Sequence, residues 1–403
     1  MEIKYFDLSG KELLLNGKKV TDFITAAGGT PVYLYSKEVI KYKVAELRSY
    51  LPKSVKIYYA AKANPHPEII AYLNQLVDGF DIASINELNV CLAALAKPHN
   101  ISFAGPGKSN QELAIAIENN ILLNVESLNE IKRIENLQIK INKKARIALR
   151  INPNFDIKNS GMKMSGGSKP FGIDSELIPE IINYLNNIGL NLEGFHIYSG
   201  SQSLDADIIC EMQNQAVDLI KTFIPFMMKP IKSLNLGGGF GIPYFKDDHP
   251  LDLEKIKLHS QSLTENIYAN FGMIDIIIEL GRFLVGESGI YITKIIDKKT
   301  SRGQTFIITD GGMNHHLAAS GNLGQIIKKN YPIYILNKLN SNTKEVLNIA
   351  GPLCTPLDQL GNQITIDKCE VGDLVGIFQS GAYGFTASPL YFLSHPLPKE
   401  IIF

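Results

Sequence analysis

The sequence predicts a (β/α)₈ barrel followed by an all-β domain. Eight short apolar runs lie between residues 56 and 278, each flanked by glycine, proline or polar turns. Helical patterns fill the gaps between them, which is the alternation of parallel strands joined by helices. After residue 284 the pattern changes, and strand-like runs follow one another with few helical stretches.

The eight runs are the expected barrel strands, at residues 56–60, 79–83, 101–104, 122–125, 147–151, 192–197, 233–236 and 274–278. Helical patterns occupy 37–51, 67–76, 85–94, 110–119 and 204–226, among others. An open Rossmann-type sheet has the same alternation. The number of strands and their extent of about 240 residues favour a closed barrel.

The expected domain limits follow from this change of pattern. Residues 1–30 read as short extended pieces around turn signals and would most simply join the β domain. Residues 31–284 form the barrel, and residues 285–403 form the β domain. Its expected strands are 290–297, 305–309, 345–350, 363–367 and 374–378.

The composition excludes several classes of protein. The 403 residues include 40 basic and 40 acidic side chains, so no overall field favours nucleic acid or an anionic membrane. No run of 18 apolar residues and no signal-peptide pattern occurs, so we expect a cytoplasmic protein. The four cysteines are scattered without metal-site or disulfide spacing, and we expect no metal. A small molecule or another protein is the expected partner.

Lys62 is the first candidate for chemistry, because it stands where the apolar run 57–61 ends. An ammonium group at such a place is partly desolvated, which favours the neutral amine that can attack a carbonyl. A lone lysine after a strand is more often a surface residue. The interpretation therefore depends on what the other strand ends supply.

The ends of the last two barrel strands supply an anion site and a charged pair. Gly237-Gly238-Gly239 follows the seventh run, and consecutive glycines let several backbone N–H groups approach one anion. Glu279-Leu280-Gly281-Arg282 ends the eighth run, although a mutual salt bridge would also explain its charges. Pyridoxal phosphate needs an amine for its aldehyde, a carboxylate for its ring nitrogen and cationic or N–H groups for its phosphate. We therefore predict that Lys62 holds pyridoxal phosphate as a Schiff base.

Other strand ends also carry polar side chains. His196 and Ser199 follow the sixth run, where a flat imidazole can stack on the cofactor ring and a hydroxyl can meet the phosphate. Asp81 ends the second run and Arg150 the fifth. Each could be a rim residue without chemistry, but catalytic residues of barrels gather at this end.

Two loops of the expected β domain add further candidates. Cys354 stands four residues ahead of Asp358 in a loop bounded by glycine and proline, although cysteine is more often buried filler. Tyr383 lies in the small-residue turn 380–384.

In this order, the segments resemble the fold type III pyridoxal phosphate-dependent amino acid decarboxylases, which include diaminopimelate and eukaryotic ornithine decarboxylase. The matching segments are 59–64, 80–84, those around His196 and the triglycine, 279–282, 354–358 and 381–383, so the resemblance covers nearly the whole chain. It implies an alanine racemase-like fold and a carboxy-lyase that acts on an amino acid or an amino acid conjugate.

The resemblance also implies residue roles and a homodimer with shared active sites. Cys354 would donate a proton from across the dimer interface, and Asp358 would face the distal end of the substrate. The implied catalytic residues are Lys62, His196 and Cys354. The implied cofactor-binding residues are Lys62, Asp81, His196, Ser199, Gly238, Gly239, Glu279, Gly281, Arg282 and Tyr383. The implied substrate-binding residues are Arg150, Cys354, Asp358 and Tyr383.

Two departures from the family pattern bear on the substrate. Leu280 stands where the family usually has proline, which leaves both neighbouring functional side chains in place. Pro170 is inserted into what is typically Lys-Phe-Gly, which argues against diaminopimelate or a simple diamine precursor. The segments 310–321, 351–358 and 392–396 resemble the exosortase-associated, butirosin-assembly and siderophore-pathway decarboxylases. An acyl carrier protein is therefore among the expected partners.

Two other functions remain open from the residues. An amino acid racemase of the same fold needs two opposed bases at the α-carbon. A non-catalytic relative would bind only the cofactor or a partner protein, but such relatives usually lose key site residues, which are all present here.

Overall fold

The computed structural model describes residues 3–155, 162–163, 167–198, 200–323, 325 and 327–403. The chain forms two compact units. We call residues 42–242 with 250–284 the barrel unit, and residues 1–41 with 243–249 and 285–403 the sheet unit. No helix among the described residues is long and apolar enough to span a membrane.

Eight parallel strands close the barrel, as predicted. In order around the barrel they are β4 (Val55–Ala60), β5 (Gly79–Ile82), β6 (Ile101–Phe103), β7 (Leu122–Val125), β8 (Arg146–Asn152), β11 (Leu192–His196), β13 (Ser233–Asn235) and β14 (Asp275–Leu280). β14 pairs with β4, and β7 with β8, so the sheet has no open edge within this ring. Nearly all of their residues are buried, which is why these strands read as continuous apolar runs.

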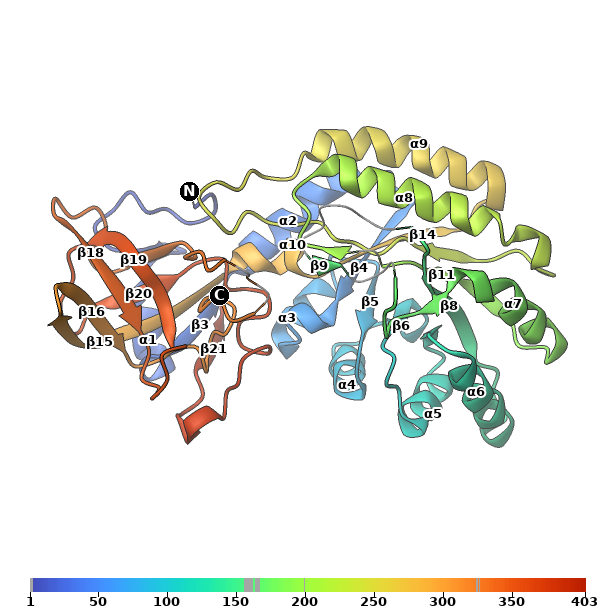
Figure 1. The fold of residues 1–403 in the computed structure, drawn as a ribbon, viewed down its shortest axis with the longest axis horizontal. Coiled ribbons are helices and arrows are strands. Elements are labelled where there is room, and N and C mark those ends of the chain that lie inside the picture. The colour runs from blue at the N-terminus through green and yellow to red at the C-terminus, as the bar shows by residue number, and fades with distance from the viewer. Residues whose placement is uncertain (1–2, 156–161, 164–166, 199, 324, 326) are drawn as a thin grey trace. The chain divides into compact units, whose positions relative to one another are not determined.

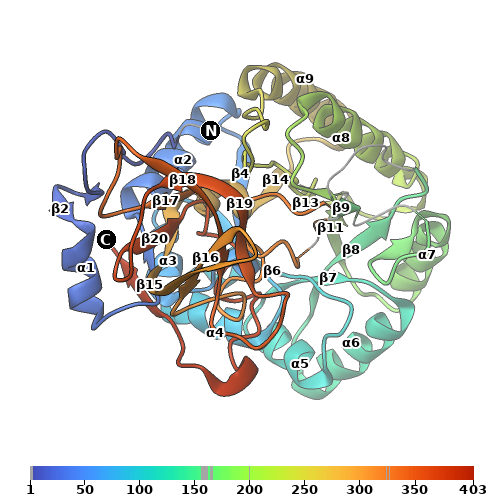
Figure 2. The ribbon, with the colours of Figure 1, turned by 60° about the vertical axis from the view of Figure 1, so that its left-hand side comes forward.

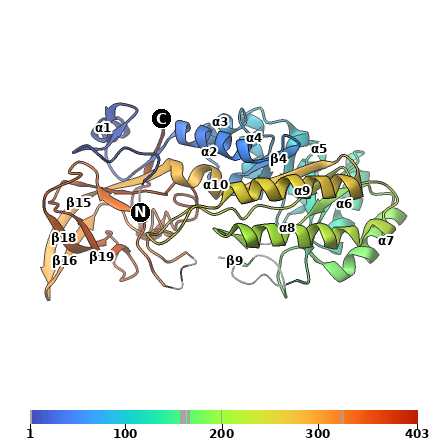
Figure 3. The same ribbon diagram turned by 90° about the horizontal axis from the view of Figure 1, so that it is seen from above.

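Helices form the outer layer of the barrel unit (Figure 2). They are α3 (Pro67–Leu73), α4 (Ile85–Ala93), α5 (Asn110–Glu118), α6 (Leu128–Ile141), α7 (Ile178–Asn187), α8 (Ala206–Lys221) and α9 (Leu253–Phe271), with α2 (Lys37–Tyr50) and the short α10 (Arg282–Val285) at its two ends in sequence. α8 and α9 lie side by side (Figure 3). Ser84, Ser109 and Ser127 begin α4, α5 and α6, and each side chain accepts the N–H of a glutamate three residues later.

Three short strands lie outside the barrel ring. β9 (Met162–Lys163) pairs with β12 (Gly200–Ser201), and β10 (Ile173–Asp174) pairs with β8. The second pairing holds the loop around Phe171 and Gly172 at the carboxyl end of β8.

The sheet unit contains an eight-stranded sheet (Figure 1). Its strands are β17 (Ile333–Ile335), β20 (Leu374–Ile377), β15 (Gly289–Ser301), β16 (Gln304–Thr309), β18 (Lys344–Ala350) and β19 (Gln359–Asp367), with β3 (Val32–Tyr35) between β15 and β21 (Lys399–Ile402). The five strands predicted after residue 284 are present. β3 belongs to this sheet, whereas the predicted barrel began at residue 31. The sequence pattern did not place β3 correctly because its partners, β15 and β21, lie more than 250 residues away along the chain.

The N-terminal residues differ from the expected short extended pieces. β1 (Leu14–Leu15) and β2 (Lys18–Lys19) pair with each other and do not extend the large sheet. Val20–Ala27 forms helix α1, whose Val20, Phe23 and Ile24 pack into the core of the sheet unit. The spacing of these apolar residues is that of one helix face, and this signal could have predicted the helix.

Candidate active site

Four predicted site residues meet at the carboxyl ends of the barrel strands, namely Lys62, Asp81, His196 and Glu279. Lys62 lies in the 3₁₀ turn Ala61–Ala63 directly after β4. Its Nζ is 3.2 Å from Oε1 of Glu279 and 3.8 Å from Oδ2 of Asp81. The strand register produces this cluster, because Asp81 pairs with Ala60 on one side of β4 and Glu279 pairs with Tyr58 on the other.

The pKa values of the two carboxyl groups in this cluster shift in opposite directions, although both groups are buried. Burial and the charge of Glu279 raise the pKa of Asp81 well above its ordinary value. Burial also pushes the pKa of Glu279 upward, but the ammonium of Lys62 and the neighbouring His196 outweigh it, and the pKa falls below its usual range. Protonation is therefore favoured at Asp81 and ionisation at Glu279.

His196 ends β11 and faces the same carboxylate. Its Nε2 lies 3.3 Å from Oε2 of Glu279, and burial lowers the pKa of the imidazole, so the ring is neutral near pH 7. Both ring nitrogens of His196, Oε2 of Glu279 and Oδ2 of Asp81 are buried and have no hydrogen-bond partner among the described residues. Buried polar atoms are almost always paired, so this concentration of unpaired atoms indicates a ligand site.

The glycines after β13 bring the backbone close to neighbouring strand ends. A Cβ at Gly238 would overlap the carbonyl oxygen of Glu279, and one at Gly239 would lie 2.8 Å from the carbonyl oxygen of Gly200. Gly239 also has a positive φ of 87°. A Cβ at Gly281 would lie 2.7 Å from that of Ala63. These positions leave a close-fitting, side-chain-free wall at the end of the barrel that holds Lys62.

Arg150 lies beside His196 in register, and its guanidinium is paired with a residue that the sequence analysis did not identify. Nη1 donates to Oε1 of Glu126 at 2.9 Å. The same carboxylate accepts the N–H groups of Gly105, at 2.6 Å, and Gly172, at 3.0 Å. Glu126 directly follows β7, so the rule that polar residues at strand ends form the site would have found it.

Three predicted residues lie in loops of the sheet unit. Cys354 is exposed in the loop between β18 and β19, whereas Cys91 and Cys369 are buried. Asp358 in the same loop is 3% exposed, and Tyr383 lies in the turn after β20 with a positive φ of 57°. Ser199 lies outside the described residues. Arg282 is the first residue of α10.

A family model for the pyridoxal-dependent decarboxylases, pyridoxal binding domain, matches residues 37–286. This span is more than half of the chain. The protein belongs to this family of pyridoxal-dependent decarboxylases. It is therefore a carboxy-lyase whose family uses pyridoxal phosphate, as the sequence predicted.

Individual relatives cover nearly the whole decarboxylase. The L-glutamyl-(BtrI acyl-carrier protein) decarboxylase of Niallia circulans is 38% identical over 93% of this chain and 88% of its own. The 2-((L-alanin-3-ylcarbamoyl)methyl)-2-hydroxybutanedioate decarboxylase of Staphylococcus aureus is 30% identical over 92% of this chain and 93% of its own. The crystal structure of diaminopimelate decarboxylase from M. jannaschii in complex with L-lysine matches with a TM-score of 0.88, 28% identity and coverage of 99% and 93%.

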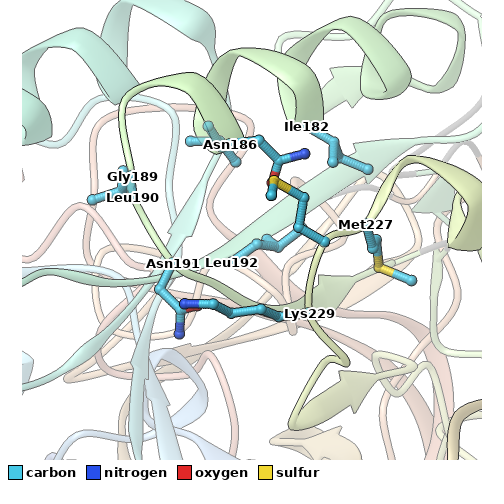
Figure 4. Close-up of a pocket in the computed structure, with 10 residues that line it drawn as sticks. Ile182, Asn186, Gly189, Leu190, Asn191, Leu192, Met227 and Lys229 are labelled. Carbon is cyan, nitrogen blue, oxygen red and sulfur yellow. The ribbon is translucent and has the colours of Figure 1, made fainter.

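The residues at the carboxyl end of the barrel fit pyridoxal phosphate. The cluster offers an amine, an ionised carboxylate and a neutral imidazole, and its unpaired buried atoms are polar. Gly238, Gly239 and Gly281 pack against neighbouring backbone without side chains, and turns of this kind can direct backbone N–H groups at an anion. A cavity of about 200 Å³ at the opposite end of the barrel does not fit, because the described residues that line it, which include Leu192, Met227 and Lys229, offer no carboxylate for the ring nitrogen (Figure 4).

Proposed function

We propose that the decarboxylase removes the α-carboxylate of an amino acid joined to a larger group, with a carrier-bound L-glutamyl group as the first candidate. The 38% identity to the L-glutamyl-(BtrI acyl-carrier protein) decarboxylase over 93% of the chain supports this substrate. A conjugate of an amino acid with a hydroxy diacid is the second candidate, supported by the Staphylococcus aureus relative. Both names describe an amino acid attached to another molecule.

When bound, pyridoxal phosphate supplies a protonated ring that accepts the electron pair left by the departing carboxylate. In our proposal Lys62 binds the cofactor covalently through its amine and yields that position to the substrate amine. Glu279 would keep the ring nitrogen protonated as a carboxylate, with Nε2 of His196 3.3 Å from its Oε2. His196 would contact the ring as a neutral imidazole.

The phosphate would be held by the glycine wall and its neighbours. We assign this role to Gly238, Gly239, Gly281 and Arg282, with Ser199 and Tyr383 as further ligands. The first three have no side chains and pack against neighbouring backbone, so their N–H groups could approach an anion, and the guanidinium would add a fixed positive charge. Burial and the charge of Glu279 raise the pKa of Asp81, which disfavours a second negative charge beside the amine of Lys62.

Arg150 would bind an anionic part of the substrate near the ring. Its charge is balanced by Glu126, and its guanidinium carbon lies 5.3 Å from the centre of the Phe171 ring. These contacts hold the guanidinium at the inner rim of the barrel. We therefore expect Arg150 to orient a carboxylate rather than to supply net charge.

Cys354 would return a proton to the α-carbon. We propose a homodimer in which the Cys354 loop of one subunit completes the active site of the other. Tyr383 would also contact the substrate there. An isolated subunit would then bind the cofactor but would not turn over substrate.

The test is a comparison of substrates with the cofactor-loaded enzyme. Glutamyl-loaded carrier protein, the hydroxy diacid conjugate, free L-glutamate, L-lysine, L-ornithine, L-arginine and diaminopimelate are assayed for CO₂ release and product configuration. We expect a conjugate to exceed every free amino acid by about 100-fold or more in kcat/KM, because binding energy from the attached group accelerates the reaction. The Lys62→Ala variant is the control and should be inactive. Efficient turnover of diaminopimelate alone would contradict the proposed substrate, and racemisation without CO₂ would contradict the reaction.

A further inference from the structure

Asp358 joins two loops of the sheet unit through its side chain. Its Oδ1 accepts the N–H of Met313 at 2.6 Å, and its Oδ2 accepts the N–H of Leu353 at 2.8 Å. Met313 follows β16 by a few residues, and Leu353 lies in the loop after β18. Because each oxygen accepts a backbone N–H and the residue is 3% exposed, the carboxylate is part of the interior.

Two glycines leave the space that this carboxylate fills. A Cβ at Gly312 or at Gly351 would overlap the carboxylate oxygens of Asp358. The same Cβ at Gly351 would also overlap the Cα of Gly312, so the two loops touch at these glycines. The carboxylate is therefore enclosed on both sides by backbone.

The loop that carries Cys354 is closed by the same residue. The N–H of Gly351 donates to the carbonyl of Asp358 at 3.2 Å, and the N–H of Asp358 donates to the carbonyl of Thr355 at 3.2 Å. Leu353, which the carboxylate holds, is the residue directly before Cys354. The exposed thiol of Cys354 thus lies on a loop that is closed by the backbone and the side chain of one buried residue, Asp358.

We propose that Asp358 is a positioning residue that fixes the Cys354 loop and does not contact the substrate. This inference rests on the proposed role of Cys354 in the reaction. It replaces the expectation that Asp358 faces the distal end of the substrate. A carboxylate that accepts two backbone N–H groups makes strong, charge-assisted hydrogen bonds, and these hold the loop geometry.

The test variant is Asp358→Asn in the cofactor-loaded, full-length enzyme. An amide can accept only one of the two N–H groups, and its NH₂ then faces the other donor. We expect amide hydrogen exchange in residues 351–358 and around Met313 to accelerate by about tenfold or more. We also expect a lower kcat with an unchanged KM for the substrate that the enzyme turns over. A raised KM with unchanged exchange would show direct substrate contact and overturn the inference.

Alkylation of Cys354 gives a measurement that does not depend on turnover. Burial raises the pKa of Cys91 and Cys369 to about 12 and that of Cys210 to about 11, so iodoacetamide near neutral pH should reach Cys354 first. Its alkylation rate should change severalfold in Asp358→Asn. An unchanged rate would count against the inference. A changed rate in an enzyme that releases no CO₂ from any substrate would leave the loop assignment standing and reject the proposed function alone.

Two further variants separate this role from general destabilisation. Asp373→Asn alters another buried carboxylate of the sheet unit, which accepts the N–H of Glu370 at 2.7 Å, and should leave the Cys354 loop unchanged. Gly351→Ala displaces the carboxylate without removing its charge and should reproduce Asp358→Asn. If neither loop variant folds, hydrogen exchange at the amides of Met313 and Leu353 is measured in the unaltered protein. Unprotected exchange at both amides would refute their hydrogen bonds to Asp358.

Discussion

Asp81 and Glu279 show how position alone gives two carboxyl groups different chemistry. They flank β4 on its two sides, both are nearly inaccessible, and both have a carboxylate oxygen within 3.8 Å of Nζ of Lys62. Glu279 has a closer ammonium and an imidazole, whereas for Asp81 burial and the charge of Glu279 outweigh the hydrogen bond that the hydroxyl of Ser102 donates to it. The first is stabilised as an anion, and the second is stabilised as an acid.

Asp81→Asn should therefore change the pH dependence of stability. Because the folded state raises the pKa of Asp81, its contribution is complete below the ordinary value of 3.8 and is lost as pH rises through the folded-state pKa. Asparagine cannot ionise, so the melting temperature of Asp81→Asn relative to the unaltered protein should rise from about pH 4 to about pH 8. Thermal unfolding of the two cofactor-free proteins across this pH range measures the difference in melting temperature. A difference that stays constant with pH would contradict the assignment.

Glu279→Gln should behave in the opposite way. The lowered pKa of Glu279 gives a contribution that is present above its ordinary value of 4.5 and is lost as pH falls, so the variant should be least stable, relative to the unaltered protein, near neutral pH. Its kcat should fall by about 100-fold or more, because the charge that sustains the cofactor's ring proton is removed. The matched control is Asp275→Asn at the other end of β14, whose carboxylate pairs with Lys56 and whose loss should leave kcat nearly unchanged.

The loop after β13 and the end of β14 form one structural element of the site. Gly238 lies directly against the backbone of Glu279, so the glycine wall and the carboxylate cannot move independently. Glu126 joins three other strand ends in the same manner, through Arg150, Gly105 and Gly172. The site is thus held by backbone contacts between strand ends as well as by its reactive side chains.

Gly238→Ala should weaken cofactor binding and stability together. The added methyl group has no space beside the carbonyl of Glu279, and overpacking of this kind costs about 1–3 kcal/mol. Urea unfolding and cofactor titration by absorbance measure the two effects. Gly107→Ala is the control, because its Cβ would meet nothing within 4 Å. Equal behaviour of the two variants would show that the wall tolerates a side chain.

The complete protein is expected to work as a pair of subunits. If Cys354 of one subunit serves the Lys62 site of the other, neither Lys62→Ala nor Cys354→Ala homodimers contain an intact site. When the two variants are mixed in equal amounts and exchange subunits at random, half of the dimers contain one subunit of each variant. Each mixed dimer has one intact site, so activity should recover to about one quarter of that of the unaltered enzyme. Activity after mixing, with each variant alone as the control, measures this. No recovery despite verified subunit exchange would refute shared sites.

The sequence by itself determined the eight barrel strands, the family and the placement of Lys62, His196 and Glu279 at one end of the barrel. Buried strands are apolar along their whole length, and residues at their carboxyl ends must meet once the barrel closes. Local pattern was therefore sufficient for these features.

Only the tertiary structure decided in which direction the pKa of each buried carboxyl group shifts, where Arg150 finds its partner, and that β3 pairs with β15 and β21. It also decided that the oxygens of Asp358 are occupied by backbone N–H groups. Each of these depends on neighbours distant in sequence. The burial and charge that those neighbours impose are properties of the folded chain, and no local pattern of residues carries them.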